Sequence, residues 1–264
     1  RDFCLSRGLG DVYKRQDEQE FLKNYKPGDY ERPSVTSDIL VFTTEENRLQ
    51  ILLIKREGYP YRNCWAIPGG FVGMKESTIE AAKRELKEEA GIENVHLEQL
   101  YTFSEPDRDP RMRIISVAYM AAVPRYKIKN HFSGDDANSS EIFDIFLDNG
   151  KLQLVGETDG LIVTGNELAF DHEKIIEMAI ERLKGKMNYS TIAFNFLENQ
   201  NAFTLRELYK IFNAVNGKEE DFSNFRKKII NVFSVEKNFI SEIDVTEDAD
   251  GKGRPSRMWK CNNS

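Results

Sequence analysis

Two periods of apolar residues run along this chain and predict where its strands and helices lie. Alternating or short continuous apolar runs indicate strands, whereas apolar residues three and four positions apart indicate one buried face of a helix. Both patterns occur along this chain, so both strands and helices are predicted. The residues predicted as strands in the first part of the chain are 35–42, 50–54, 95–103, 114–123, 142–147, 152–155 and 161–163.

The first predicted helix follows Ser77. Ser77 and Glu80 have the spacing of a capping box, and Gly91 stands where a left-handed residue usually ends a helix. The same period predicts a second helix at 171–184. The apolar residues that share a face are Ile79, Ala82, Leu86 and Ala90 in the first helix, and Ile175, Ile176, Ala179 and Leu183 in the second.

After residue 186 the predicted helices become shorter and end in a hairpin. Helix, turn, helix and a hairpin with a basic turn form the pattern of a winged helix-turn-helix domain. We therefore predict a first domain at 17–186 and a winged helix-turn-helix domain at 187–264. Three helices are predicted in it: the first at 189–197, the second after the capping box Thr204 to Glu207, and the third from Asp221 or Ser223. Two strands are predicted at 239–245 and 257–260.

Residues 1–16 fit neither period and carry no cap. Within them, SRGLGDVYKRQ from Ser6 to Gln16 resembles a translated adapter used in preparing sequencing libraries. We expect this stretch to be a non-native leader. The alternative is an ordinary N-terminal tail.

The composition is that of a globular protein. The 264 residues are enough for two domains, and 40% hydrophobic with 31% charged residues is ordinary. No apolar run approaches the ~18 residues of a membrane helix, and no signal-peptide pattern is visible. The three cysteines are far apart and the three histidines show no ligand spacing. We expect a cytoplasmic location without membrane association.

Three carboxylates crowd one sector of the first helix. At about 100° per residue, Glu85, Glu88 and Glu89 fall close together, and like charges at this spacing destabilise an isolated helix. A hard divalent cation held by oxygen ligands makes such a cluster favourable. The alternative from the residues alone is a solvated acidic face.

The spacing around this cluster resembles the Nudix box. Gly70 is followed after five residues by Glu76 and after seven more by Arg84-Glu85, an apolar residue, any residue, Glu88-Glu89, any residue, Gly91 and an apolar residue. The resemblance implies an α/β/α sandwich that hydrolyses a nucleoside-linked diphosphate with Mg²⁺, or with Mn²⁺. It implies that Glu85 and Glu89 are the main metal ligands, and that Glu88 and the Gly70 carbonyl contribute. Glu76 and Arg84 would hold the loop to the helix.

A loop at 104–113 contains two prolines, which exclude a strand, and three arginines. With the sequence before it, the loop resembles that of Nudix proteins which bind ADP-ribose. We therefore predict that it contacts this substrate or a similar nucleoside diphosphate derivative; the alternative is a salt-bridged surface loop. The predicted contacts are Arg108, Arg111 and Arg113, stacking by Tyr101 or Phe103, and a phosphate contact from Arg56, for which a plain surface cation is the alternative.

A further acid is expected beside the box. ADP-ribose hydrolases of this family often use an acidic residue of a later loop to complete the site or to act as base. Asp136 and Glu141 are the two candidates in this sequence. Solvated loop acids are the alternative.

Basic residues gather at two places in the second predicted domain. Its bulk is not basic, because residues 187–264 hold 11 basic and 11 acidic side chains. The prediction of double-stranded DNA binding therefore rests on clustering, and a helical accessory or dimerisation domain is the alternative. The predicted contacts are Arg226, Lys227 and Lys228 on a recognition helix at 223–232, and Lys252, Arg254 and Arg257 on the wing.

The order of the two domains resembles that of Nudix-related transcriptional regulators of NAD metabolism. Many such regulators lack carboxylates of the box, whereas this chain keeps them all. We expect a Nudix hydrolase fused to a DNA-binding domain and assembled as a homodimer. The alternative is a repressor that senses ADP-ribose with little or no catalytic activity.

Overall fold

The structure is a computed structural model that describes residues 17–29, 31–129, 140–148, 151–247 and 256–262. The chain divides into two compact units, residues 1–33 and 34–264. In the first unit, residues 17–24 are helical and a 3-10 helix, η1, covers Pro27–Asp29. The sequence analysis predicted no helix there, because these exposed residues show no apolar period. Among the described residues, no helix is long and apolar enough to cross a membrane.

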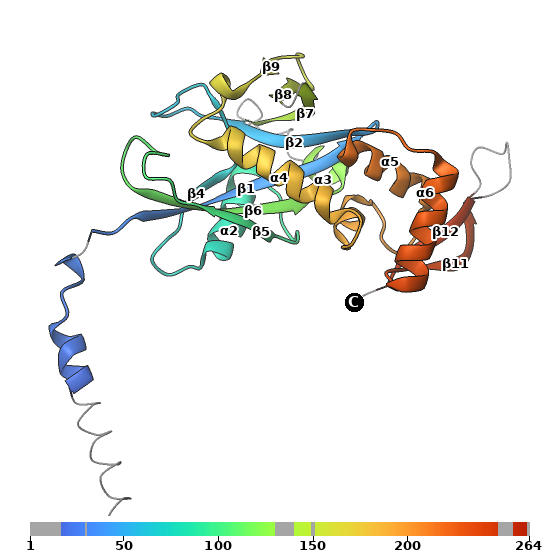
Figure 1. Cartoon of the computed structure of the whole chain (residues 1–264). Helices are drawn as coiled ribbons and strands as arrows, with labels where there is room; N and C mark the ends of the chain where they lie inside the picture. The colour runs from blue at the N-terminus through green and yellow to red at the C-terminus, as the bar shows by residue number, and fades with distance from the viewer. Residues whose placement is uncertain (1–16, 30, 130–139, 149–150, 248–255, 263–264) are drawn as a thin grey trace, which may run out of the picture. The chain divides into compact units, whose positions relative to one another are not determined.

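One large sheet carries the first part of the second unit (Figure 1). Its strand order is β5-β6-β1-β2-β7-β8-β9, with β3 on β2 and β4 on β1; β1 and β6 are parallel. The predicted strands are confirmed, with shifted ends. The strands are β1 Ser34–Glu45, β2 Arg48–Lys55, β3 Trp65–Ala66, β4 Gly69–Phe71, β5 Glu98–Phe103, β6 Ile114–Ala122, β7 Ser140–Asp148, β8 Lys151–Gly156 and β9 Ile162–Val163.

Successive side chains of β1 enter two different cores, because neighbouring residues of a strand point to opposite faces. Ile39 and Val41 pack with α2 (Thr78–Ala90), and Leu40 and Phe42 pack with α4 (His172–Lys186). Helices on both faces make the predicted α/β/α sandwich.

Helix α2 is capped as predicted and tied to the sheet. The Ser77 and Glu80 side chains form the capping box, and Gly91 ends the helix with φ 61°. Ser37 Oγ donates to the Thr78 carbonyl at 2.7 Å, which fixes the start of the helix against β1. The buried face is Ala81, Ala82, Leu86 and Ala90; the expected inward position of Ile79 is wrong, since its side chain is exposed.

The C-terminal elements form the predicted winged-helix pattern. A three-stranded sheet of order β10-β12-β11 packs with α5 and α6. The helix expected at 189–197 is a shorter 3-10 helix, and α6 continues as a π-helix. The elements are η3 Ile192–Phe196, β10 Phe203–Thr204, α5 Leu205–Asn216, α6 Phe222–Ile229, η4 Ile230–Glu236, β11 Ile240–Glu247 and β12 Ser256–Cys261.

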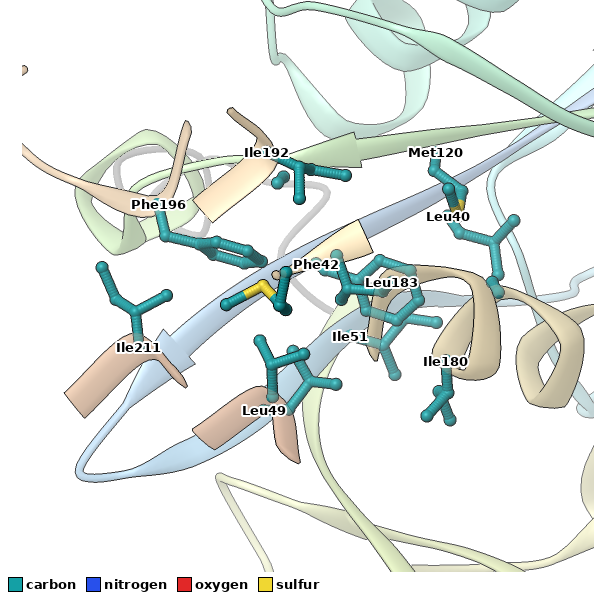
Figure 2. Packing of buried hydrophobic residues seen from close by; sticks show 14 of the residues in the cluster. Leu40, Phe42, Leu49, Ile51, Met120, Ile180, Leu183, Ile192, Phe196 and Ile211 are labelled. Atoms are coloured by element: carbon teal, nitrogen blue, oxygen red, sulfur yellow. The ribbon is translucent and has the colours of Figure 1, made fainter. Parts of the chain in front are cut away.

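The sandwich and the C-terminal elements share one hydrophobic core (Figure 2). Phe42 and Leu49 of the sheet, Leu183 of α4 and Ile211 of α5 belong to the same buried cluster. Burying this joint apolar surface stabilises both parts at once.

Several short elements of the second unit were not predicted, because two to five residues show too little of an apolar period. Apart from β3, β4 and β10, they are α3 Arg125–Lys129 and η2 Gly165–Glu167. β4 pairs with β1, so that Asp38 lies opposite Gly69 and Ser37 opposite Gly70. This pairing places the first glycines of the box beside the start of β1.

Candidate functional site

Arg84 binds three carboxylates of the box. Its guanidinium donates to Glu76 at 2.8 and 3.2 Å, to Glu85 at 2.6 Å and to Glu88 at 3.1 Å. It also donates to the Phe71 carbonyl at 3.1 Å, so loop and helix are joined as the resemblance implied. The repulsion that we expected a cation to relieve is therefore already reduced by Arg84 itself, and these hydrogen bonds raise the pKa of Arg84.

Glu89 lies deeper, against the glycines. Its Oε2 accepts a hydrogen bond from the Gly69 N–H at 2.8 Å. Burial, with the nearby charges of Glu85 and Asp38, raises the Glu89 pKa to about 7 although that hydrogen bond opposes the shift. A Cβ at Gly70 would overlap the Glu85 carboxylate, so glycine is what lets this acid approach the loop.

Asp38 is an acid of the same cleft that the sequence analysis missed. It is buried on β1, accepts a hydrogen bond from Ser116 Oγ, and lies 4.0 Å from the Arg108 guanidinium. Burial raises its pKa to about 6. An isolated acid in an apolar strand looks like an ordinary surface residue in sequence, so no pattern pointed to it.

The donor set of this cleft fits a hard divalent cation. Glu85 and Glu89 present carboxylates beside the Gly69-Gly70 backbone, and Glu89 forms no ion pair with any described residue. A half-buried carboxylate with no ion-pair partner is costly, and carboxylate and carbonyl oxygens are what Mg²⁺ prefers. Glu88 accepts a hydrogen bond from Arg84. Among the described residues, no three acidic, histidine or cysteine side chains form a preformed metal site.

A buried ion pair closes the inner end of the cleft. Arg108 donates to Asp171 at 2.6 and 3.1 Å, and both side chains are almost fully buried. The next residue, His172, accepts a hydrogen bond from the Ile67 N–H at 3.0 Å through Nδ1. Burial and the charges of Arg108 and Arg56 lower the His172 pKa to about 3, which keeps the ring neutral. His172 therefore holds the segment before Gly69 through Ile67.

Two arginines and two aromatic rings form the outer part of the cleft. The Arg56 guanidinium lies 4.9 Å from the Phe170 ring centre, and that of Arg111 lies 5.6 Å from it and 5.5 Å from Phe71. Arg111 also donates to Asp109 at 2.8 and 3.0 Å. The cavity between these groups and Glu89 has a volume of about 140 Å³. Phe170 was missed because it stands alone between a hairpin and a helix.

Other predicted residues lie outside this cleft. Tyr101 is exposed on β5 and contacts Phe103 edge to face, and Arg113 is an exposed residue before β6. Glu141 lies on β7, where it accepts a hydrogen bond from the Thr158 N–H at 3.1 Å; burial raises its pKa. Asp136 lies outside the described residues. The structure thus brings Arg56, Arg108 and Arg111 to the box, whereas Tyr101, Arg113 and Glu141 do not line the cleft beside Glu89.

The C-terminal sheet and helices present a basic hollow. Arg226 of α6 and Arg257 of β12 line a cavity of about 260 Å³ together with Arg206, whose guanidinium lies 4.8 Å from the Phe222 ring centre. Arg206 was not among the predicted contacts, because it stands alone at the start of α5.

The remaining basic residues of this region differ in their surroundings. Lys227 is exposed, and Lys228 lies 3.9 Å from Glu220. Arg257 pairs with Glu242 at 3.1 Å. The predicted wing residues Lys252 and Arg254 lie outside the described residues.

This fold and site define a class, a Nudix domain joined to a winged-helix domain, and the comparisons agree. A family model described as NUDIX domain matches residues 33–153, and one described as NrtR DNA-binding winged helix domain matches residues 193–261. The predicted boundary at 186/187 falls between the two matched regions and stays a prediction.

Among the proteins that resemble this chain are two relatives and one solved structure. The ADPR responsive transcriptional repressor NtrR of Acinetobacter baylyi is 31% identical, with 92% of this chain and 88% of that protein covered. The ADP-ribose pyrophosphatase of Methanocaldococcus jannaschii is 38% identical, with 63% of this chain and 80% of that protein covered. The structure of Shewanella oneidensis NrtR complexed with a 27mer DNA has a TM-score of 0.66 and 25% identity, covering 86% of this chain and 93% of that one. The chain belongs to the family of Nudix proteins that carry an NrtR-type winged-helix domain.

Proposed function

We propose that the Nudix domain hydrolyses the diphosphate of ADP-ribose or of a similar nucleoside diphosphate derivative. The observation that supports this best is the cleft, where the carboxylates of Glu85 and Glu89 meet the Gly69-Gly70 backbone opposite Arg56 and Arg111. Carboxylates for a cation and guanidiniums for phosphate are the two halves of a diphosphate site. The similarity to a protein named ADP-ribose pyrophosphatase is consistent with this substrate.

In this proposal Glu85, Glu89 and the Gly70 carbonyl hold Mg²⁺, or Mn²⁺ in its place. A bound cation of this kind polarises the diphosphate and lowers the pKa of attacking water. Glu88 would contribute a further carboxylate to this cation, and Arg84 holds Glu76 and the Phe71 carbonyl of the loop in place. Arg56 and Arg111 bind the phosphates. Glu141 and Asp136 remain candidates for the base.

The test is turnover by the purified full chain. With Mg²⁺ present, ADP-ribose should give AMP and ribose 5-phosphate in equal amounts, resolved by ion-exchange chromatography. The same reaction with excess chelator should give neither. A wild-type protein that cleaves no nucleoside diphosphate derivative under these conditions would rule the proposal out.

We propose a second function, ADP-ribose-responsive binding of double-stranded DNA by a homodimer. The basic hollow of Arg206, Arg226 and Arg257 supports it, since guanidiniums suit DNA phosphates. The relatives named as a repressor and as NrtR complexed with DNA support it as well. Lys227, Lys228, Lys252 and Arg254 are the other predicted contacts.

DNA binding is tested on the region upstream of the protein's own coding sequence. Fluorescence anisotropy across a salt series should show specific binding whose affinity falls by roughly 0.9 log units per log unit of salt for each phosphate contact. Arg226→Gln should reduce that slope by about one contact. Equal affinity for unrelated DNA at every salt concentration would leave the winged helix as an accessory domain.

A further inference from the structure

Phe170 has a strained backbone at the edge of the cleft. Its φ is 54°, in the left-handed region that bulky side chains rarely occupy. The residues on either side hold it there: the Ala169 N–H donates to the Trp65 carbonyl at 2.8 Å, and Asp171 is paired with Arg108. A strained position that its neighbours enforce points to a role for the side chain.

The Phe170 ring is enclosed by two cations and two other rings. The Arg56 guanidinium lies 4.9 Å and that of Arg111 5.6 Å from its centre. Tyr61 and His172 lie 4.8 and 5.4 Å from the same centre. The half-buried ring lines the cavity, and these four groups cover part of the surface that a nucleotide base would need. The ring can, however, fix the guanidiniums that lie against it, since aromatic faces attract cations.

The two guanidiniums need such a fixed support because they repel each other. Burial and the charge of Arg111 lower the pKa of Arg56. Arg111 is paired with Asp109, whereas Arg56 donates through Nε to the Pro60 carbonyl at 3.0 Å. The two terminal nitrogens of Arg56 make no hydrogen bond to any residue that the structure describes, so they are free for a ligand. Asp109 and Glu89 attract Arg56 to the cleft, and the ring fixes where its guanidinium lies beside that of Arg111.

We infer that Phe170 is a positioning residue that holds Arg56 and Arg111 side by side as a clamp for the diphosphate of the ligand. The ligand class rests on the proposed function of the Nudix domain. The role assigned to Phe170 is to hold two cations in place, without touching the reacting atoms. Binding of the diphosphate then offsets the repulsion between the two guanidiniums, which the ring has already aligned.

The direct test is the affinity of the full chain for ADP-ribose without Mg²⁺, measured by calorimetry. Phe170→Leu should weaken binding by about 5- to 20-fold, the range of a cation–aromatic contact. Phe170→Tyr keeps the ring and should stay within about two-fold of wild type. Phe146→Leu is the matched control, because Phe146 is a half-exposed phenylalanine of β7 outside the cleft. The affinity of this variant for ADP-ribose should equal that of wild type.

A second variant guards against misfolding. Phe170→Asn removes the ring and suits a positive φ, so it relieves the backbone strain that leucine would keep. It should melt no earlier than wild type and still bind ADP-ribose as weakly as Phe170→Leu does. Wild-type affinity in Phe170→Asn, or weak binding by Phe170→Tyr, would overturn the inference.

A mutant cycle in the background of both Arg56→Gln and Arg111→Gln shows whether the ring acts through the arginines. In that background Phe170→Leu should cost no more than about two-fold. A loss as large as in wild type would mean that the ring contacts the ligand itself, which contradicts the inference. In turnover with Mg²⁺, Phe170→Leu should raise KM and change kcat by less than about two-fold.

The outcomes separate the two proposals. A wild type that binds ADP-ribose without cleaving it removes the hydrolase proposal, and the affinities still decide on Phe170. A wild type that binds no ADP-ribose overturns both.

Discussion

At the scale of single residues, Arg84 already offsets part of the carboxylate charge that a bound cation would neutralise at this helix. Glu85 and Glu88 already share the charge of Arg84, whereas the half-buried Glu89 has no ion-pair partner among the described residues and the buried Asp38 lies only at 4.0 Å from Arg108; both have raised pKa values. The strongest electrostatic demand for a cation therefore lies at the inner end of the cleft. This order could not be read from the sequence, in which the three glutamates look equivalent.

Glu89→Gln tests that demand directly. Glutamine keeps the volume and can accept the Gly69 hydrogen bond, but removes the charge that would hold the cation. We expect hydrolysis of ADP-ribose to fall by at least ~10²-fold, since even loss of residues that support metal ligands costs roughly 10- to 100-fold. Initial rates with saturating Mg²⁺ measure it. Glu93→Gln, an exposed acid outside the cleft, is the control, and equal rates in Glu89→Gln and wild type would contradict the assignment.

Asp38→Asn should alter the pH dependence of stability. The Asp38 pKa rises from 3.8 to about 6 on folding, so the folded protein holds this proton more tightly than the unfolded chain. Stability from this group is then present below about pH 4 and is lost as pH rises to about 6. Asparagine does not titrate, so Asp38→Asn cannot lose this contribution. Between about pH 4 and about pH 6 in Mg²⁺-free buffer, the melting temperature of the variant should therefore fall less than that of wild type. Glu89, with its pKa raised to about 7, keeps a residual slope in both proteins. The exposed loop acid variant Asp107→Asn should follow wild type; identical curves for Asp38→Asn would refute the prediction.

At the scale of elements, the caps were the most predictable features. The boxes of α2 and α5 form as their spacing indicates, because a cap depends on residues three positions apart. Long strands were predictable for the same local reason. The cleft was predictable only in part: Glu76 and Arg84 share a helix and its loop, whereas Asp38 and Phe170 come from β1 and the start of α4. Tertiary packing brings those together, and no local pattern records it.

Thr204→Ala tests the cap of α5. The Thr204 hydroxyl accepts from the Glu207 N–H at 3.2 Å, and the Glu207 carboxylate accepts from the Thr204 N–H at 2.6 Å. Loss of the threonine oxygen should lower the free energy of unfolding by ~1 kcal/mol. Urea denaturation followed by circular dichroism measures it. Thr204→Ser keeps the oxygen and should recover most of the loss; a serine variant as unstable as alanine would show that the methyl group matters instead.

At the scale of the whole second unit, α4 connects the cleft with the winged helix. Its first turn is fixed by the Arg108–Asp171 pair and the His172–Ile67 hydrogen bond. Its last turn carries Leu183 into the core that also contains Ile211 of α5 (Figure 2). Packed cores switch between arrangements and do not deform gradually. A displacement of α4 at the cleft should therefore also displace the end of the helix that packs against α5.

This connection predicts reciprocal coupling between ADP-ribose and DNA. If ADP-ribose weakens DNA binding by some factor, DNA must weaken ADP-ribose binding by the same factor. The corresponding coupling free energy is typically ~1–3 kcal/mol. Turnover would destroy the effector, so both affinities are measured without Mg²⁺, by anisotropy for DNA and calorimetry for ADP-ribose. Asp171→Asn leaves Arg108 with a neutral partner and should reduce the coupling factor, whereas Asp107→Asn should not. Two affinities that are each independent of the other ligand would show that the shared core holds the two parts together without transmitting a signal between them.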